Sequence, residues 1–164
     1  MPMTLSTNIF YRNTGNGNFV DATKEFGFEN YTPTSAYSLI DIDQDGDLDL
    51  INNANDAPVY AYINNNTDGH SISFELLDFK TSNLSALNAT VSIHYTDRTS
   101  QRALQQQRII KGSGGYRSYN EPAAHFGLGQ TSEITEVRIK WPDGSISSLK
   151  GEFLAGQKYR ITRK

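Results

Sequence analysis

The stretch Asp41-Ile42-Asp43-Gln44-Asp45-Gly46-Asp47-Leu48-Asp49 places a carboxylate at every second position. In a regular strand these side chains would lie on one face, about 7 Å apart, and would repel one another. A tight loop around a hard cation removes this repulsion, because the carboxylate oxygens then share a positive partner. The stretch therefore predicts a metal-binding loop rather than a continuous strand.

Calcium is the cation that suits this set of donors best. It takes about six to eight oxygen ligands in a flexible geometry, whereas magnesium prefers fewer carboxylates and retains more of its own water. Zinc is disfavoured because the chain has no Cys and its three His residues show no ligand spacing. We therefore expect Ca2+ as the cofactor; an exposed acidic turn without a metal is the alternative. The expected metal residues are Asp41, Asp43, Asp45, Asp47 through its backbone carbonyl, and Asp49 directly or through water.

The residues on either side of the loop favour strands over helices. A helix–loop–helix calcium site needs a bidentate Glu at the twelfth loop position, which here is Asn52. The flanks Ala36-Tyr37-Ser38-Leu39-Ile40 and Leu50-Ile51-Asn52-Asn53 are also poor helix formers. A strand–loop–strand arrangement, in which the ion closes a hairpin around the sharp turn at Gly46, fits these flanks best.

The composition favours an all-β fold. Nine Tyr and eight Phe suit pleated, half-buried surfaces, and thirteen Gly supply turns between them. Alternation and short apolar runs dominate over helical spacing, and only Ser100–Arg108 is open to either a helix or a strand. The expected strands are Ile9–Arg12, Ala36–Ile42, Leu48–Asn52, Val59–Ile63, Ser71–Phe79, Ala89–Tyr95, Leu104–Lys111, Glu136–Trp141, Ser145–Leu149 and Lys158–Thr162.

The charge is divided unevenly along the chain. Residues 1–80 carry twelve acidic and three basic side chains, a net charge of about −9, whereas residues 81–164 carry six and twelve, about +6. This asymmetry suggests two modules. The basic residues of the second half are interleaved with Gln and Ile as on a solvated strand face, so we expect no nucleic-acid partner. No apolar run approaches the roughly 20 residues of a membrane span, so we expect no membrane insertion.

Two further patterns bear on the fold. Trp141-Pro142-Asp143-Gly144 predicts a tight hairpin turn, because Pro presets one central φ and Gly tolerates the left-handed region. Residues 10–13 also align with residues 61–64, a faint repeat at an offset of 51 residues. Repeats of this length suggest propeller blades. A single blade leaves sheet edges bare, so either a longer propeller or the second module must cover them.

These motifs resemble two known families in succession. Asp41–Asp49 resembles the calcium loop of FG-GAP/VCBS repeats, the units of integrin-type β-propellers, and residues 10–23 resemble the stretch that precedes such loops. Downstream, the chain resembles the ASPIC/UnbV domain that follows these repeats in cartilage-acidic-protein-like and bacterial exported proteins. The family usually has Gly where this chain has Asn88, and Asn also tolerates the left-handed region. The downstream matches are Ser82-Asn83, Ala89-Thr90-Val91, Gly114–Ser118, His125–Gly129 and Val137–Gly144.

The resemblance implies one propeller-type repeat with a calcium loop, packed against a C-terminal antiparallel β-sandwich-like domain. We expect the repeat at residues 1–69 and the ASPIC/UnbV-like domain at residues 70–164. It also implies a binding or adhesion role in an extracellular, cell-surface or periplasmic setting, within the C-terminal part of a longer propeller protein. The expected partners are the rest of the parent chain and a protein or glycan ligand.

The residues favour a non-catalytic role. No Gly-x-Ser-x-Gly elbow is present, and the acids gather in one loop where a metal would occupy them. His125 could be a general base, but a turn residue whose ring bonds a backbone group is the favoured interpretation. Tyr116, Tyr119 and Trp141 are the candidate ligand-binding residues, as an aromatic platform for a sugar, although packing is their favoured use. Two alternative functions are an architectural propeller cap and an accessory domain of a polysaccharide-acting hydrolase.

Overall fold

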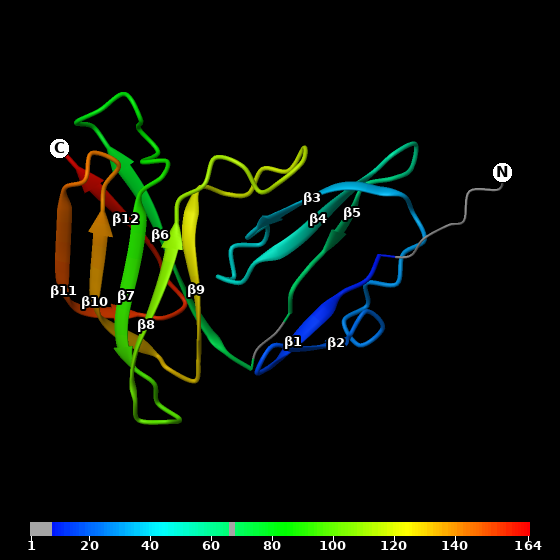
Figure 1. The fold of residues 1–164 in the computed structure, drawn as a ribbon, viewed down its shortest axis with the longest axis horizontal. Coiled ribbons are helices and arrows are strands. Elements are labelled where there is room, and N and C mark those ends of the chain that lie inside the picture. The colour runs from blue at the N-terminus through cyan, green and yellow to red at the C-terminus, as the bar shows by residue number, and fades with distance from the viewer. Residues whose placement is uncertain (1–7, 66–67) are drawn as a thin grey trace.

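The computed structural model describes residues 8–65 and 68–164, which form an all-β fold as the composition predicts (Figure 1). Residues 1–7 and 66–67 of the predicted repeat lie outside the described part. No helix in the described part has the length and apolar character needed to cross a bilayer. The strands are β1 (Tyr11–Gly15), β2 (Asn18–Asp21), β3 (Thr34–Ile40), β4 (Asp49–Ala54), β5 (Tyr60–Tyr62), β6 (His70–Asp78), β7 (Thr90–Thr96), β8 (Ala103–Ile109), β9 (Ala123–Gly129), β10 (Glu133–Lys140), β11 (Ile146–Leu154) and β12 (Lys158–Arg163).

The N-terminal part consists of a small hairpin and a three-stranded meander. Strands β1 and β2 pair around Asn16 and Gly17, whose φ angles are 52° and 78°. Two successive positive φ values match the twist of a two-residue hairpin, which explains the Asn-Gly pair. Strands β3, β4 and β5 form an antiparallel sheet, and the Asp-rich loop connects β3 to β4. The loop is therefore flanked by strands, as expected.

The C-terminal part is a sandwich of two sheets. One sheet has the order β11-β10-β7-β8 and the other the order β12-β6-β9, with β12 parallel to β6 and the remaining pairs antiparallel. Alternate residues of both sheets point inward and are almost fully buried, which makes the core. The largest fully buried hydrophobic side chains of this core are Phe74, Phe126, Ile72, Leu76, Ile93, Ile110, Ile134, Ile139, Val91 and Val137.

The turn at Trp141-Pro142-Asp143-Gly144 confirms the predicted hairpin. The N–H of Gly144 donates to the carbonyl of Trp141 at 2.9 Å, and Gly144 has a φ of 83°. Strands β10 and β11 leave this turn as an antiparallel pair. Asn88 also adopts the left-handed region, with a φ of 71°, so the turn survives without Gly.

Arg163 holds the end of the sandwich together. Its Nε donates to Asp78 Oδ1 at 3.0 Å and its Nη1 to Asp143 Oδ2 at 2.9 Å, while its guanidinium lies 4.5 Å from the ring centroid of Trp141. Asp78 is fully buried and also accepts hydrogen bonds from Lys80 N and Thr81 Oγ1. We call Asp78, Trp141, Asp143 and Arg163 the arginine cluster. It ties β6, β12 and the β10–β11 hairpin to one another.

The arginine cluster predicts a specific acid sensitivity. Hydrogen bonds from Ser145, supported by Arg163, lower the pKa of Asp143 from 3.8 to about 2. A carboxylate with a lowered pKa stabilises the fold above about pH 4 and loses that contribution as the pH falls through about 2. In calcium-free buffer, Asp143→Asn is therefore expected to melt only slightly below the wild type at pH 6, because solvent screens this partly exposed carboxylate, and this difference should close between pH 4 and pH 2. A constant difference across that range, measured by circular dichroism, would contradict this assignment.

The two parts of the chain meet along strand β3. Residues 118–121, in the loop between β8 and β9 that reaches toward the meander (Figure 1), bond to the outer edge of this strand. Tyr37 N–H donates to Ser118 Oγ at 3.3 Å, and Leu39 N–H donates to Asn120 Oδ1 at 3.0 Å. The C-terminal part therefore covers one edge of the meander, which is one of the two solutions that the single repeat required.

All ten predicted strands overlap observed strands, and two observed strands were not predicted. Ser100–Arg108, which the sequence left open, contains most of strand β8. Strand β2 was not among the predicted strands; it has only four residues and directly follows the Asn-Gly turn. Strand β9 has two Ala and two Gly among seven residues, which depresses its strand propensity. Its alternating buried residues Ala124, Phe126 and Leu128 were the missed signal.

Candidate metal centre

The Asp-rich loop is built from two left-handed residues and two side-chain-to-backbone turns. Gln44 and Gly46 have φ angles of 62° and 96°, which fold the chain back on itself. Asp45 N–H donates to Asp43 Oδ1 at 3.4 Å, and Asp47 N–H donates to Asp45 Oδ1 at 2.9 Å. Short Asp side chains commonly support turns in this way. The alternation of Asp with other residues therefore produces a compact loop instead of a strand.

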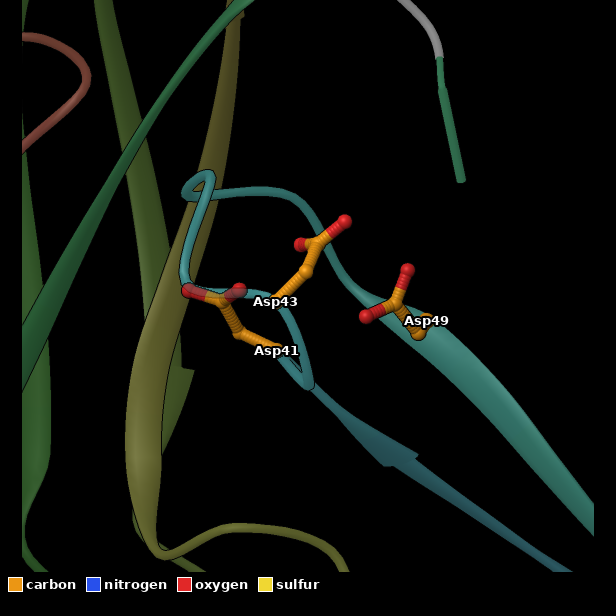
Figure 2. A group of neighbouring side chains, drawn as sticks. All are labelled: Asp41, Asp43 and Asp49. Carbon is orange, nitrogen blue, oxygen red and sulfur yellow. The ribbon is translucent and has the colours of Figure 1, made fainter. Parts of the chain in front are cut away.

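Three of the five predicted metal residues gather at one point. Each of Asp41, Asp43 and Asp49 offers a carboxylate oxygen, and these atoms all lie within 4.8 Å of one another. Figure 2 shows the three carboxylates around a common space, with Asp41 and Asp43 from the loop after β3 and Asp49 from the start of β4. Asp49 is buried, Asp41 is partly buried and Asp43 is exposed. The space thus has a buried wall and an open side.

Asp49 is also a structural brace. Its Oδ2 accepts the N–H of Ile42 at 2.7 Å, and its Oδ1 accepts the N–H of Asn64 at 2.8 Å. The side chain therefore closes the base of the loop and ties it to the segment that leaves β5. An ionised carboxylate has about four acceptor sites, so these two bonds leave room for a cation.

The Asp41 side chain shows whether a cation suits the space between the three carboxylates. Its Oδ1 is buried and has no hydrogen-bond partner within the described chain. A buried carboxylate oxygen without a partner is costly, and a divalent ion beside two further carboxylates removes that cost. Hard carboxylate oxygens are also the donors that calcium prefers. The residues present therefore fit a calcium ion.

Asp45 and Asp47 lie outside this group of three. The Asp45 side chain supports the turn, whereas Asp47 is turned toward the C-terminal sandwich, near Ser71 and His125. Burial raises the pKa of Asp47, Asp45 adds to the increase, and His125 and Ser71 oppose it. The five predicted residues thus divide into three that converge through their side chains and two that shape or anchor the loop.

His125 differs from its expected role as a turn residue with a backbone partner. It lies in strand β9, and its Nδ1 is 3.0 Å from Ser73 Oγ on strand β6. Burial lowers the pKa of His125, which favours the neutral ring, although the charge of Asp47 opposes this effect. His125, Asp41 and Leu48 line a small cavity of about 160 Å³ between the loop and the sandwich.

The three predicted ligand-binding aromatics do not form one platform. Tyr116 and Tyr119 are 75% and 57% exposed, whereas Trp141 is 2% exposed. Trp141 lies in the arginine cluster, and its Nε1 donates to Ser147 Oγ at 2.8 Å. Its ring is therefore a packing element, which agrees with the use that the sequence favoured. Tyr116 lines a cleft of about 700 Å³ together with Tyr37 and Asn52 of the meander.

The sequence did not indicate Asn64 and Ser71 as parts of the site. Asn64 donates its backbone N–H to Asp49, and Ser71 Oγ donates to the carbonyl of Gly46 at 2.6 Å. Both contacts join residues that are 15 or more positions apart in the chain. No local pattern reports such pairs, so only the fold reveals them.

Comparisons with known proteins match the chain in two segments. A family model described as ASPIC and UnbV matches residues 79–164, and one described as an FG-GAP-like repeat matches residues 4–52. Cartilage acidic protein 1 from Mus musculus and from Homo sapiens is 51% identical over 41 residues, 25% of this chain. The protein of that name from Xenopus tropicalis is 51% identical over 39 residues, 24% of this chain. Each match covers 6% of the relative's own length.

Proposed function

This chain belongs to the ASPIC and UnbV family and carries an FG-GAP-like repeat, and on that premise we propose that it is a calcium-binding, non-catalytic binding or adhesion module. The observation that supports the metal most strongly is the buried Asp41 Oδ1 without a partner, beside the carboxylates of Asp43 and Asp49. The ion would neutralise this group and hold the loop closed. Its role is structural, since the loop already serves to connect two strands.

Asp41, Asp43 and Asp49 would hold calcium through their side chains. Asp45 and Asp47 lie on the same loop, where their backbone carbonyls and bound water can complete the coordination of a large, flexible cation. Asp49 would contribute even while it braces the loop, because its oxygens keep free lone pairs. The proposed site thus uses the five residues in unequal roles.

The wider setting is proposed from the two families together. We infer an extracellular, cell-surface or periplasmic module in the C-terminal part of a longer propeller protein. The remainder of that protein is one partner, and the second is a protein or glycan ligand. The exposed Tyr116 and Tyr119 are the residues to which such a ligand would most readily bind.

Calcium is expected to raise the melting temperature of the chain. At a free concentration about 100 times the Kd, one site stabilises by about 2.7 kcal/mol, which corresponds to roughly 5–10 °C for a chain of this size. The measurement is thermal unfolding after exhaustive chelation, with and without millimolar calcium. Magnesium at the same concentration and the remote variant Asp97→Asn serve as controls. An unchanged melting temperature on calcium addition would reject the proposed site.

An architectural cap is the second candidate function. It is favoured by the bonds from residues 118–121 to the outer edge of β3, because these bonds close an edge that would otherwise pair with other strands. A cap would bind the upstream repeats of its parent protein and no separate ligand. Co-purification with those repeats, together with a blank result against glycan and protein arrays, would select the cap over the adhesion module.

A further inference from the structure

The Asp-rich loop lies between the two parts of the chain, and its two sides face different neighbours. On one side, Asp41, Asp43 and Asp49 surround the candidate metal position. On the other side, the carbonyl of Gly46 accepts the hydroxyl of Ser71, a buried residue of strand β6. The loop is also in van der Waals contact with the sandwich here, since a Cβ on Gly46 would lie 3.5 Å from Ser71 Oγ and 3.9 Å from Gly156 Cα. The loop tip therefore rests directly on the sandwich.

The loop is also continuous with the strand that carries the rest of the interface. Asp41 follows immediately after Ile40, the last residue of β3. The outer edge of β3 bonds to the sandwich domain at four places, through the N–H groups of Tyr37, Leu39, Tyr119 and Glu121. These N–H groups lie on both partners, two on β3 and two on the segment that covers it. The position and the order of the backbone at the end of β3 therefore affect the hydrogen bonds of the whole interface.

From this placement we propose that the cation loop couples the two parts of the chain, so that occupancy of the metal position orders the interface between the repeat and the sandwich. The inference rests on the proposed calcium function. Without a cation, five carboxylates in nine residues repel one another and favour a looser loop. That loosening reaches the interface through two connections, the end of β3 and the Gly46–Ser71 hydrogen bond. With a cation, both connections are held in place.

Thermodynamic linkage makes the coupling reciprocal. If the cation stabilises the interface, then an intact interface must strengthen cation binding by the same factor. A change at Ser71 should therefore weaken calcium binding, although Ser71 is not one of the carboxylate residues that surround the metal position. Asn120, whose side chain accepts the N–H of Leu39, offers a second perturbation at the edge of β3.

Hydrogen exchange of individual amides tests the coupling in the whole chain. Calcium is expected to slow exchange at the four interface N–H groups by at least about fivefold, as well as at the amides of Ile42 and Asn64, which donate to Asp49. In Ser71→Ala and Asn120→Ala, calcium affinity measured by calorimetry should fall about three- to tenfold, and the interface protection should shrink. Ser92→Ala, on the outer face of β7, is the matched control and should change neither quantity.

The outcomes separate this inference from the function on which it rests. If calorimetry shows calcium binding and the amides of Ile42 and Asn64 become protected while the four interface amides exchange as before, the coupling is rejected and the calcium site stands. Unchanged calcium affinity in both Ser71→Ala and Asn120→Ala would reject the coupling as well. If calorimetry shows no calcium binding, the calcium site and the coupling both fail.

Discussion

Arg163→Ala is expected to lower the melting temperature of the chain by ~10 °C or more, because it removes one partner of a buried ion pair. Asp78 would keep a charge in a fully buried position, with only Lys80 N and Thr81 Oγ1 left to stabilise it. The variant also removes the cation from the face of Trp141 and the hydrogen bond to Asp143. Three elements of the sandwich would therefore lose their common contact at once.

The matched control is Arg160→Ala, three residues earlier on the same strand. Arg160 pairs with Glu75 at 2.9 Å, but its side chain is 65% exposed, and exposed pairs of this kind contribute little. Unfolding can be followed by tryptophan fluorescence, because Trp141 is the single Trp of the chain and lies against Arg163. The melting temperature of Arg163→Lys should lie between those of Arg163→Ala and Arg160→Ala, since Lys keeps the charge but cannot donate in a bidentate fork. Equal melting of the two alanine variants would show that the cluster is not structurally important.

The arginine cluster gives the Trp-Pro-Asp-Gly motif a packing role in addition to its turn. The sequence correctly predicted a hairpin turn there, because Pro and Gly restrict the backbone locally. It favoured packing for Trp141 but could not identify the packing partners, since Arg163 lies 22 positions further on and Asp78 lies 63 positions earlier. An aromatic residue at a turn is compatible with either a surface platform or a packed ring. The long-range partner decides between them.

The fold as a whole shows the same contrast between local signals, which the sequence reveals, and long-range partners, which it does not. Period-two alternation predicted most strands because it follows from the pleat of a single strand and needs no partner. The parallel pairing of β12 with β6 has no such local signal, since the two strands are more than 70 residues apart. Strand β9 shows the opposite case, in which the alternation was present but Gly and Ala masked it. Pairing order and weak strands were therefore the parts that sequence could not supply.

The candidate metal centre was predictable in its composition and only in part in the roles of its residues. Five carboxylates around one Gly indicated a cation loop through charge repulsion alone. Which carboxylates converge depends on the path of the loop, and that path is set by Gln44 and Gly46 in the left-handed region. The anchoring of the loop on Ser71 depends on the second part of the chain. The sequence indicated a backbone role for Asp47, but it did not show that the Asp45 side chain supports the turn or that Asp49 also braces the loop.

These unequal roles predict opposite behaviour for two isosteric variants in the absence of calcium. Asp49→Asn is expected to destabilise the chain by about 2–4 kcal/mol, or roughly 5–10 °C, even in chelator. Asp49 accepts one N–H on each oxygen, from Ile42 and from Asn64, and an Asn amide group would replace one acceptor with a donor. One backbone N–H would then face another donor. Asp43→Asn, by contrast, should leave the melting temperature unchanged or raise it slightly, because it removes one of several like charges from an exposed position.

Addition of calcium completes the comparison. Both variants lose one carboxylate of the converging group, so both should show a smaller rise in melting temperature than the wild type at the same calcium concentration. In chelator only Asp49→Asn should be unstable, because only Asp49 braces the loop through two hydrogen bonds below 3 Å. Thermal unfolding of the wild type and the two variants, with chelator and with calcium, gives the required differences. If Asp43→Asn were as unstable as Asp49→Asn in chelator, the distinction between brace and ligand would be lost. If neither variant reduced the calcium response, the three carboxylates could not be the metal ligands.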